Sequence, residues 1–268
     1  MPDAYQILLT NDDGIRSPGL WAAAEGLSAL GYVHVVAPRE QQTGMGRSLP
    51  TTSDGIIIPQ KLTVHGKEWT VYAVGGTPAQ AVLHGVLEVM PVRPDLVVSG
   101  FNYGENLGTG VTVSGSVGAA LEAASMGIPA LAASLQVPSD FYKSYSKEID
   151  FSTARYFTSL FARKMLEHGM PPDVDVVKLD VPDMATPDTP WEITRQSRQR
   201  YYRALTPDRL TWEKPGTIGY ELAVRPEEDA QDSDIYTLLV KRHVSVTALS
   251  VDMTARTSKE EICRLWAG

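Results

Sequence analysis

Two adjacent carboxylates, Asp12 and Asp13, are the residues of this sequence that most directly suggest chemistry. They follow a short apolar run at residues 5–10, which is typical of a strand buried on both faces of a parallel sheet. Neighbouring carboxylates repel each other, and a divalent cation relieves that repulsion in a crowded site. Carboxylate oxygens favour Mg²⁺, Mn²⁺ or Ca²⁺ over zinc. A plain Asn-Asp-Asp-Gly turn is the alternative, but a helix capped by Ser17 follows, where a hairpin would need a strand.

Two further polar loops are expected at the same edge of the sheet. Residues 38–53 and 100–116 each follow an expected strand, and open parallel sheets bind ligands where such loops converge. The first loop contains Gly44-Met45-Gly46, but it lacks the third glycine and the helix of a dinucleotide-binding fingerprint. In the second, Ser114-Gly115-Ser116 opens a helix whose free N–H groups would attract a phosphate. A surface loop and an ordinary helix cap are the simpler interpretations, but together the three loops indicate a site for a metal ion and a phosphate group.

Strands and helices are expected to alternate over the first two thirds of the chain. Apolar runs predict strands at 5–10, 33–37, 69–74, 96–99, 130–134 and 174–179, and helical spacing predicts helices at 18–30, from Thr77 onward, at 116–126 and within 149–168. Such alternation gives parallel strands with right-handed crossover helices on both faces. We therefore expect an α/β fold with a Rossmann-like, doubly wound, mostly parallel sheet over residues 1–182.

The remaining chain, residues 183–268, is less regular. Prolines at 187, 190, 207, 215 and 226 separate polar and aromatic residues, and strands are expected at 236–240 and 244–249, before a closing helix at 258–266. We expect this second region to form a protruding β-hairpin or arm that is used in oligomerisation.

Composition narrows the classes of function. The 268 residues include 24 Lys and Arg against 32 Asp and Glu, a net charge of −8, which argues against nucleic-acid binding through a broad basic face. Cys263 is the only cysteine, so no internal disulfide can form. No run approaches the ~18 apolar residues of a membrane span. We expect a globular cytoplasmic protein that binds neither nucleic acid nor membrane.

A series of motifs extends along nearly the whole chain. They are residues 7–14 (ILLTNDDG), 35–38 (VVAP), 76–78 (GTP), 97–108 (VVSGFNYGENLG) and 114–120 (SGSVGAA), followed by 181–182, 193–195, 200–202, 232–234 and 244–247. In these motifs the sequence resembles the SurE survival-protein family of nucleotidases. The resemblance implies a metal-dependent phosphatase that acts on nucleoside 5′- and 3′-monophosphates. It also implies a Rossmann-like core and a C-terminal part that is exchanged between subunits.

The resemblance also implies a ligand set for the metal. The family uses two adjacent aspartates, a serine hydroxyl and an asparagine, which fall on Asp12, Asp13, Thr43 and Asn102. Threonine in place of serine keeps the hydroxyl oxygen but adds a methyl group and stiffens χ1. Arg39-Glu40 stands where the family usually has Asp-Arg, which changes the charge pattern beside the site.

These inferences give one hypothesis for the mechanism. A single divalent ion, Mg²⁺ or Mn²⁺, acts as Lewis acid and orients an attacking water, and either Asp12 or Asp13 doubles as general base. The residues expected to bind substrate and phosphate are Asn11, Gly44, Asn102, Ser114, Gly115 and Ser116. A phosphoaspartyl route is disfavoured because the two aspartates are contiguous, whereas phosphatases of the haloacid dehalogenase type use Asp-x-Asp.

Other functions remain open at this point. The chain could be a non-catalytic nucleotide-binding or assembly protein that keeps the fold, or a broader phosphomonoesterase or exopolyphosphatase. In each case we expect a homo-oligomer, dimer or tetramer, formed through the C-terminal region.

Overall fold

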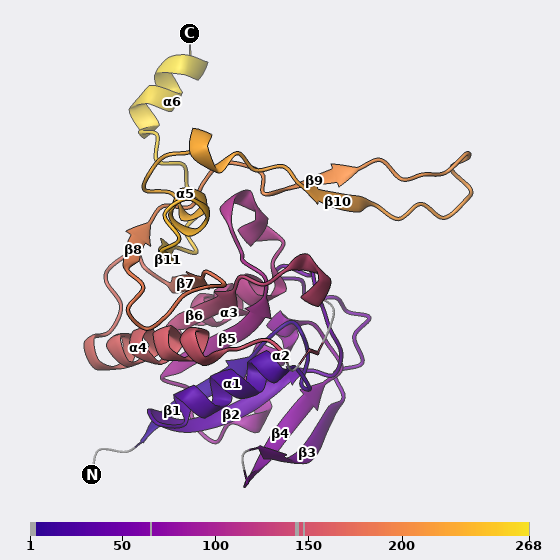
Figure 1. Cartoon of the computed structure of the whole chain (residues 1–268), viewed down its shortest axis with the longest axis vertical. Helices are drawn as coiled ribbons and strands as arrows, with labels where there is room; N and C mark the ends of the chain where they lie inside the picture. Colours follow the sequence, from indigo (N-terminus) through magenta and orange to yellow (C-terminus); the bar gives the residue numbers. More distant parts are fainter. Residues whose placement is uncertain (1–3, 65, 143–144, 147, 268) are drawn as a thin grey trace.

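The computed structural model of the chain describes residues 4–64, 66–142, 145–146 and 148–267. Within this part of the chain, nine strands form one sheet in the order β3-β4-β2-β1-β5-β6-β7-β11-β8, shown in Figure 1. The strands are β1 (Tyr5–Thr10), β2 (Gly31–Pro38), β3 (Ile57–Val64), β4 (Lys67–Val74), β5 (Leu96–Tyr103), β6 (Ala130–Leu135), β7 (Val176–Val181), β8 (Trp191–Thr194) and β11 (Val244–Leu249). The central pairs are parallel, whereas β3 pairs antiparallel with β4 and β11 pairs antiparallel with β7. The expected mostly parallel sheet is therefore confirmed.

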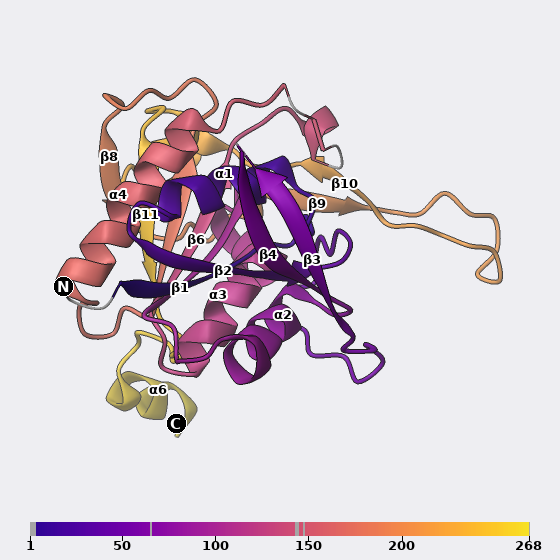
Figure 2. The same ribbon diagram turned by 90° about the horizontal axis from the view of Figure 1, so that it is seen from below.

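Helices cover both faces of the sheet (Figure 2). The helices are α1 (Pro18–Leu27), α2 (Pro78–His84), α3 (Gly115–Ser125), α4 (Ser152–His168), α5 (Asp234–Leu239) and α6 (Lys259–Trp266). Helices α1 and α4 contact each other on one face, and α2 and α3 contact each other on the opposite face. The chain passes from β1 through α1 to β2 on one side, and returns from β4 through α2 to β5 on the other side of β1. The doubly wound arrangement expected from the sequence is thus confirmed.

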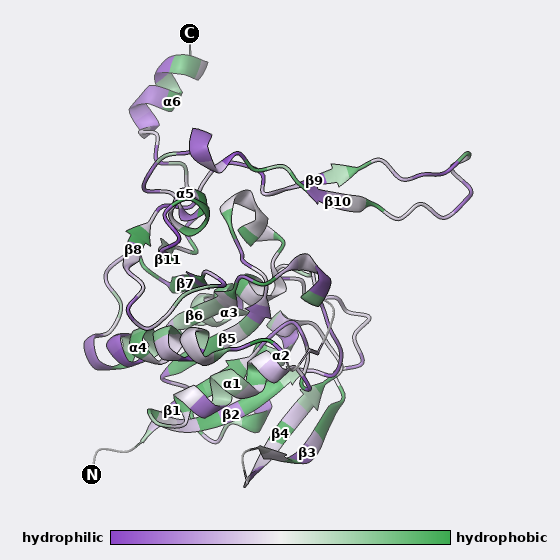
Figure 3. Ribbon diagram, viewed as in Figure 1, coloured by the Kyte–Doolittle hydropathy of each residue, from purple (hydrophilic) through white to green (hydrophobic). Residues whose placement is uncertain are grey.

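The core lies on both sides of the central strands, which Figure 3 colours predominantly as hydrophobic. Along β1, Ile7 and Leu9 join the cluster under α1 and α4, whereas Leu8 joins the cluster under α2 and α3. Successive side chains of a strand point to opposite faces, so a strand covered on both faces has to be apolar throughout. The near-continuous apolar runs in the sequence follow from this double burial.

Several element boundaries differ from those expected. Residues 236–240, expected as a strand, lie mostly in helix α5, so that prediction is wrong. The Ser233 side chain caps this helix by accepting a hydrogen bond from the Tyr236 amide at 3.0 Å, which outweighs the strand propensity of the residues that follow. Helix α1 ends at Leu27 rather than at residue 30, and α3 begins at Gly115 rather than at residue 116, with Ser114 as its N-cap.

A long hairpin arm projects from the C-terminal region. Its strands β9 (Tyr202–Leu205) and β10 (Gly219–Leu222) pair antiparallel, and the arm extends away from the sheet in both views (Figures 1 and 2). Leu210 and Trp212, between these strands, are 100% and 89% exposed. The protruding hairpin expected from the sequence is confirmed, and its use in oligomerisation stays a prediction.

The region after residue 182 also contributes to the main sheet, through β11 and β8. The division of the chain into residues 1–182 and 183–268 stays a prediction. Among the residues described, no helix combines the length and the apolar character that crossing a bilayer requires.

Candidate metal centre

The three polar loops singled out in the sequence meet at one edge of the sheet. Strands β2, β1 and β5 are parallel neighbours, so the loops that follow them leave from the same edge. The Gln42 amide donates to the Asp12 carbonyl oxygen at 2.7 Å, which joins the second loop to the first. The Tyr103 amide donates to Asp13 Oδ2 at 3.4 Å, which joins the third loop to the first. The crossovers diverge on either side of β1, and such a switch point is where open α/β sheets bind ligands.

Asp12 lies at the N-terminus of helix α3. Its carboxylate is 3% exposed, and Oδ1 accepts a hydrogen bond from the Ser116 hydroxyl at 2.6 Å. The backbone amides of Gly115 and Ser116 also bind this carboxylate, as expected for an anion at the positive end of a helix. A Cβ atom at Gly115 would lie 2.7 Å from Asp12 Cβ, so the absence of a side chain there lets the carboxylate approach the helix.

Asp13 is held more loosely. Its side chain is buried, and Oδ1 accepts a hydrogen bond from Gln41 Nε2 at 3.1 Å. The Tyr145 hydroxyl donates to the Asp13 backbone oxygen at 2.7 Å. Within the described part of the chain, no lysine or arginine forms an ion pair with either aspartate.

Burial makes this pair electrostatically costly. Burial raises the pKa of Asp12, and the hydrogen bonds from Ser116 and the two amides offset only part of that effect. Burial, followed by the negative charge of Asp12, raises the pKa of Asp13 well above its usual range. Two buried carboxylates without a cationic side chain beside them have the character of a hard-cation site.

Neutral oxygens would have to complete the coordination of such an ion. No group of three or more His, Cys, Asp or Glu residues is placed to hold a metal among the residues described. Asn102, at the end of β5, donates from Nδ2 to the Gly104 carbonyl at 2.6 Å, which leaves Oδ1 as the atom for a cation. The residues therefore fit a single divalent ion, with Asp12 and Asp13 as its anionic ligands.

Thr43 lies in an exposed segment next to this pair. Gln42, before it, binds Asp12, and the Gly46 amide, after it, donates to the Val113 carbonyl at 2.9 Å. A Cβ atom at Gly118 would lie 2.1 Å from the Gly46 carbonyl oxygen, so the segment packs directly on α3. Its coordination of a metal stays a prediction, which this placement supports.

The residues expected to bind phosphate are largely engaged within the protein. Asn11 closes its own turn, since its side chain donates to the Gly14 carbonyl at 3.2 Å and accepts from the Gly14 amide at 3.1 Å. Ser114 caps α3 by accepting from the Val117 amide at 3.1 Å, while Gly115 and Ser116 bind Asp12. Gly44 is exposed. The structure brings these residues to the same edge of the sheet, and their contact with phosphate stays a prediction.

Sequence reasoning did not find Gln41 and Tyr145, which both contact Asp13. Gln41 lies inside a loop that had been singled out, but Tyr145 is far from Asp13 in the sequence and no motif marks it. Both line a cavity of about 400 Å³ together with Arg16, Arg39 and Ile58. A second cavity of about 400 Å³, lined by Gln42, Met45 and Thr77 among others, shares Arg39 and Glu40 with the first.

Comparisons with known proteins match the chain nearly from end to end. A family model described as "Survival protein SurE" matches residues 7–203. The 5'-nucleotidase SurE of Methanosarcina mazei is 41% identical and the alignment covers 97% of both proteins. The 5'-nucleotidase SurE of Thermococcus gammatolerans is 40% identical, over 96% of this chain and 94% of that protein. The crystal structure of the SurE protein from Aquifex aeolicus is 30% identical, with a TM-score of 0.74 over 97% of this chain and 99% of that one.

The raised pKa of Asp13 predicts a trade-off between stability and metal binding. Without metal, the wild-type protein loses stability as the pH rises from the ordinary value of 3.8 through the higher pKa of the folded state. Asp13→Asn removes this loss, so in EDTA at pH 7 the variant should have the higher free energy of unfolding. Mn²⁺ at 100 times its Kd should stabilise the wild type by about 2.7 kcal/mol and the variant by much less.

Denaturant titrations with and without Mn²⁺ measure both effects. Asp188→Asn, which changes an exposed carboxylate, is the control and should behave like the wild type. A metal-free Asp13→Asn protein that is less stable than the wild type would contradict the electrostatic account of the pair.

Proposed function

This chain belongs to the SurE survival-protein family and is a nucleotidase, and we propose that it releases phosphate from nucleoside monophosphates with one divalent cation, Mg²⁺ or Mn²⁺. The observation that carries the proposal is the buried pair Asp12 and Asp13 at the switch point of the sheet, without a cationic partner among the residues described. Thr43 and Asn102 are the proposed neutral ligands. We assign both the 5′ and the 3′ monophosphates as substrates, in keeping with the family resemblance.

Each aspartate has a distinct part in the proposed mechanism. Asp12 is fixed in direction, because the Ser116 hydroxyl and two amides of α3 bind it, and these hydrogen bonds favour its charged form. When bound, the cation would polarise the phosphoryl oxygens and supply charge that the acidic chain lacks. Asp13 accepts fewer hydrogen bonds, and we therefore assign to its carboxylate the role of taking the proton of the attacking water. The remaining amide and hydroxyl groups at Gly44 and Ser114 are the proposed contacts of the phosphate.

The cavity beside Asp13 is the proposed place of the nucleoside. A volume of about 400 Å³ falls within the range of small-molecule sites. Gln41 and Tyr145 line this cavity and also contact Asp13, so a molecule bound there would extend from the metal centre. The Tyr145 ring and the Ile15 and Ile58 side chains would pack against a base and a ribose.

The exposed C-terminal elements support the proposal of a homo-oligomer, a dimer or a tetramer. Leu210 and Trp212 on the hairpin arm and Leu265 and Trp266 on α6 are large, exposed apolar side chains. Apolar groups of this size favour burial against a partner. We also place the protein in the cytoplasm, because its single cysteine suits a reducing compartment; cell fractionation tests this.

Phosphate release from AMP tests the proposed activity, and Thr43 offers a matched pair of variants. Thr43→Ser keeps the hydroxyl oxygen, so it should keep the Mn²⁺ affinity and the rate. Thr43→Val keeps the shape but removes the oxygen, so Mn²⁺ should bind about 10-fold more weakly. Equal affinity in all three proteins would exclude Thr43 as a ligand. A wild-type protein that binds AMP but releases no phosphate with any divalent cation would be a non-catalytic binding protein.

Shortening the arm tests the oligomer. In one variant, Asn-Gly replaces residues 206–218 and joins β9 to β10 through a tight turn. Sedimentation should show a smaller assembly than the wild type, while Tm shifts by only a few degrees because these residues lie outside the main sheet. An unchanged mass would remove the arm from the interface.

A further inference from the structure

A wholly buried lysine lies in the core of the protein. Lys178, on β7, has a side chain that is 0% exposed, and its Nζ lies 2.5 Å from Asp180 Oδ2 and 3.3 Å from Asp234 Oδ2. A buried ion pair seldom adds stability over apolar residues of the same volume, because desolvation of the charges offsets their attraction. The stability of the fold therefore does not explain this trio of Lys178, Asp180 and Asp234, and we looked for another role.

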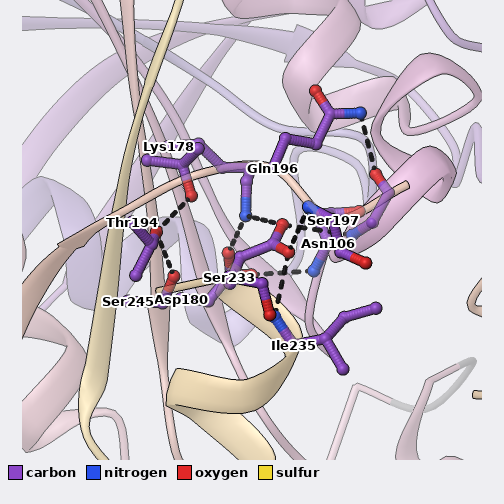
Figure 4. Close-up of polar contacts among 12 residues, drawn as sticks. Asn106, Lys178, Asp180, Thr194, Gln196, Ser197, Ser233, Ile235 and Ser245 are labelled. Atoms are coloured by element: carbon purple, nitrogen blue, oxygen red, sulfur yellow. Dashed lines mark hydrogen bonds and ion pairs between the residues drawn. The ribbon is translucent and has the colours of Figure 1, made fainter. Parts of the chain in front are cut away.

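The two carboxylates of the trio bind the backbone of a single loop, residues 102–114, which leads from the end of β5 to helix α3. Asp180 Oδ1 accepts a hydrogen bond from the Asn106 amide at 2.8 Å, and Asp234 Oδ2 accepts one from the Gly108 amide at 3.1 Å. Figure 4 shows Asn106 near Lys178 and Asp180 in one polar cluster. Hydrogen bonds from amides to carboxylates are shorter and stronger than those to neutral acceptors. Lys178 balances the charge of these two acceptors and fixes the direction in which they point.

Residues 195–199, which we call the C-terminal segment, contact the same loop. Gln196 Nε2 donates to the Gly108 carbonyl at 3.1 Å, and the Thr109 amide donates to the Gln199 carbonyl at 3.0 Å. Asp234 links this segment to the loop, because its Oδ1 accepts a hydrogen bond from the Ser197 amide at 2.9 Å and its Oδ2 accepts the one from the Gly108 amide. A Cβ atom at Gly108, where φ is +55°, would lie 2.5 Å from the Gln199 carbonyl oxygen. The loop and the C-terminal segment are thus in direct backbone contact.

Both ends of this loop lead into the metal centre. Asn102, a proposed metal ligand, lies at its start, and Ser114 caps the helix that binds Asp12 at its end. A displacement of residues 106–109 would move one or both of these ends. We propose that Lys178, Asp180 and Asp234 are positioning residues, which tie the C-terminal segment to the loop at residues 102–114 and so set the geometry of the metal centre. This inference rests on the proposed function.

The test uses variants that change the cluster less than removal of the lysine would. Lys178→Met would leave two buried carboxylates unbalanced and risks unfolding the protein, so milder changes are preferable. Asp234→Asn keeps the volume but removes the charge, and Gln196→Ala removes one hydrogen bond from a partly exposed side chain. Leu27→Ala is the control, because it opens a cavity in the apolar cluster under α1 and α4 and removes none of the hydrogen bonds to residues 106–109.

Three readouts separate positioning from stability: the Kd of Mn²⁺ measured by electron paramagnetic resonance, hydrogen exchange over residues 102–114, and the separate values of kcat and KM for AMP. For Asp234→Asn we expect about 10- to 100-fold weaker Mn²⁺ binding and faster exchange in the loop, with the loss of activity mainly in kcat. Gln196→Ala should change these quantities in the same direction by less. Leu27→Ala should lower Tm while Kd and loop exchange stay at wild-type values.

Folded Asp234→Asn and Gln196→Ala proteins with wild-type Mn²⁺ affinity and wild-type loop exchange would overturn the inference, since the trio would then be only structural. A wild-type protein that binds no Mn²⁺ and releases no phosphate would instead refute the proposed function. In that event loop exchange decides on its own whether the trio holds residues 102–114.

Discussion

Two neighbouring carboxylates, Asp12 and Asp13, are buried where the three polar loops meet, and the protein has to compensate for the cost of that burial. Taking a negative charge out of water is costly, and placing a second one beside it adds repulsion. The described residues supply hydrogen bonds to the pair but no cationic side chain. A bound divalent cation would therefore do for the folded state what a lysine or arginine does elsewhere, and would couple stability to catalysis.

The fold stabilises the two buried carboxylates mainly with backbone groups. Parallel strands bring three loops to one edge, and the N-terminus of α3 directs amides at Asp12. Close approach at Gly115 and Gly118 lets two of the loops rest on that helix. Farther from the edge, Lys178 and its two carboxylates hold the third loop. Each of these arrangements adds polar groups to a region that is otherwise packed as a hydrophobic core.

Much of this could be predicted from local sequence patterns. Apolar runs and turn signals located the central strands, and the polar residues after them located the candidate site around Asp12, Asp13 and Asn102. The helix at 234–239 was missed because Ile235, Tyr236 and Thr237 have high strand propensity, and the cap at Ser233 was not recognised in the sequence. The roles of Tyr145 and of the Lys178 trio could not be predicted from the sequence, since their contacts join segments that are far apart along the chain. The hydrogen bond between the N-terminus of α3 and Asp12 was also not foreseen, and the binding of phosphate there stays a prediction.

Diffraction from crystals grown with Mn²⁺, measured at the manganese absorption edge, shows whether the aspartate pair holds one hard cation. We expect one anomalous peak within bonding distance of Asp12 and Asp13 carboxylate oxygens and of Asn102 Oδ1. Crystals of protein that hydrolyses AMP with Mn²⁺, but that show no peak at this position, would contradict this expectation.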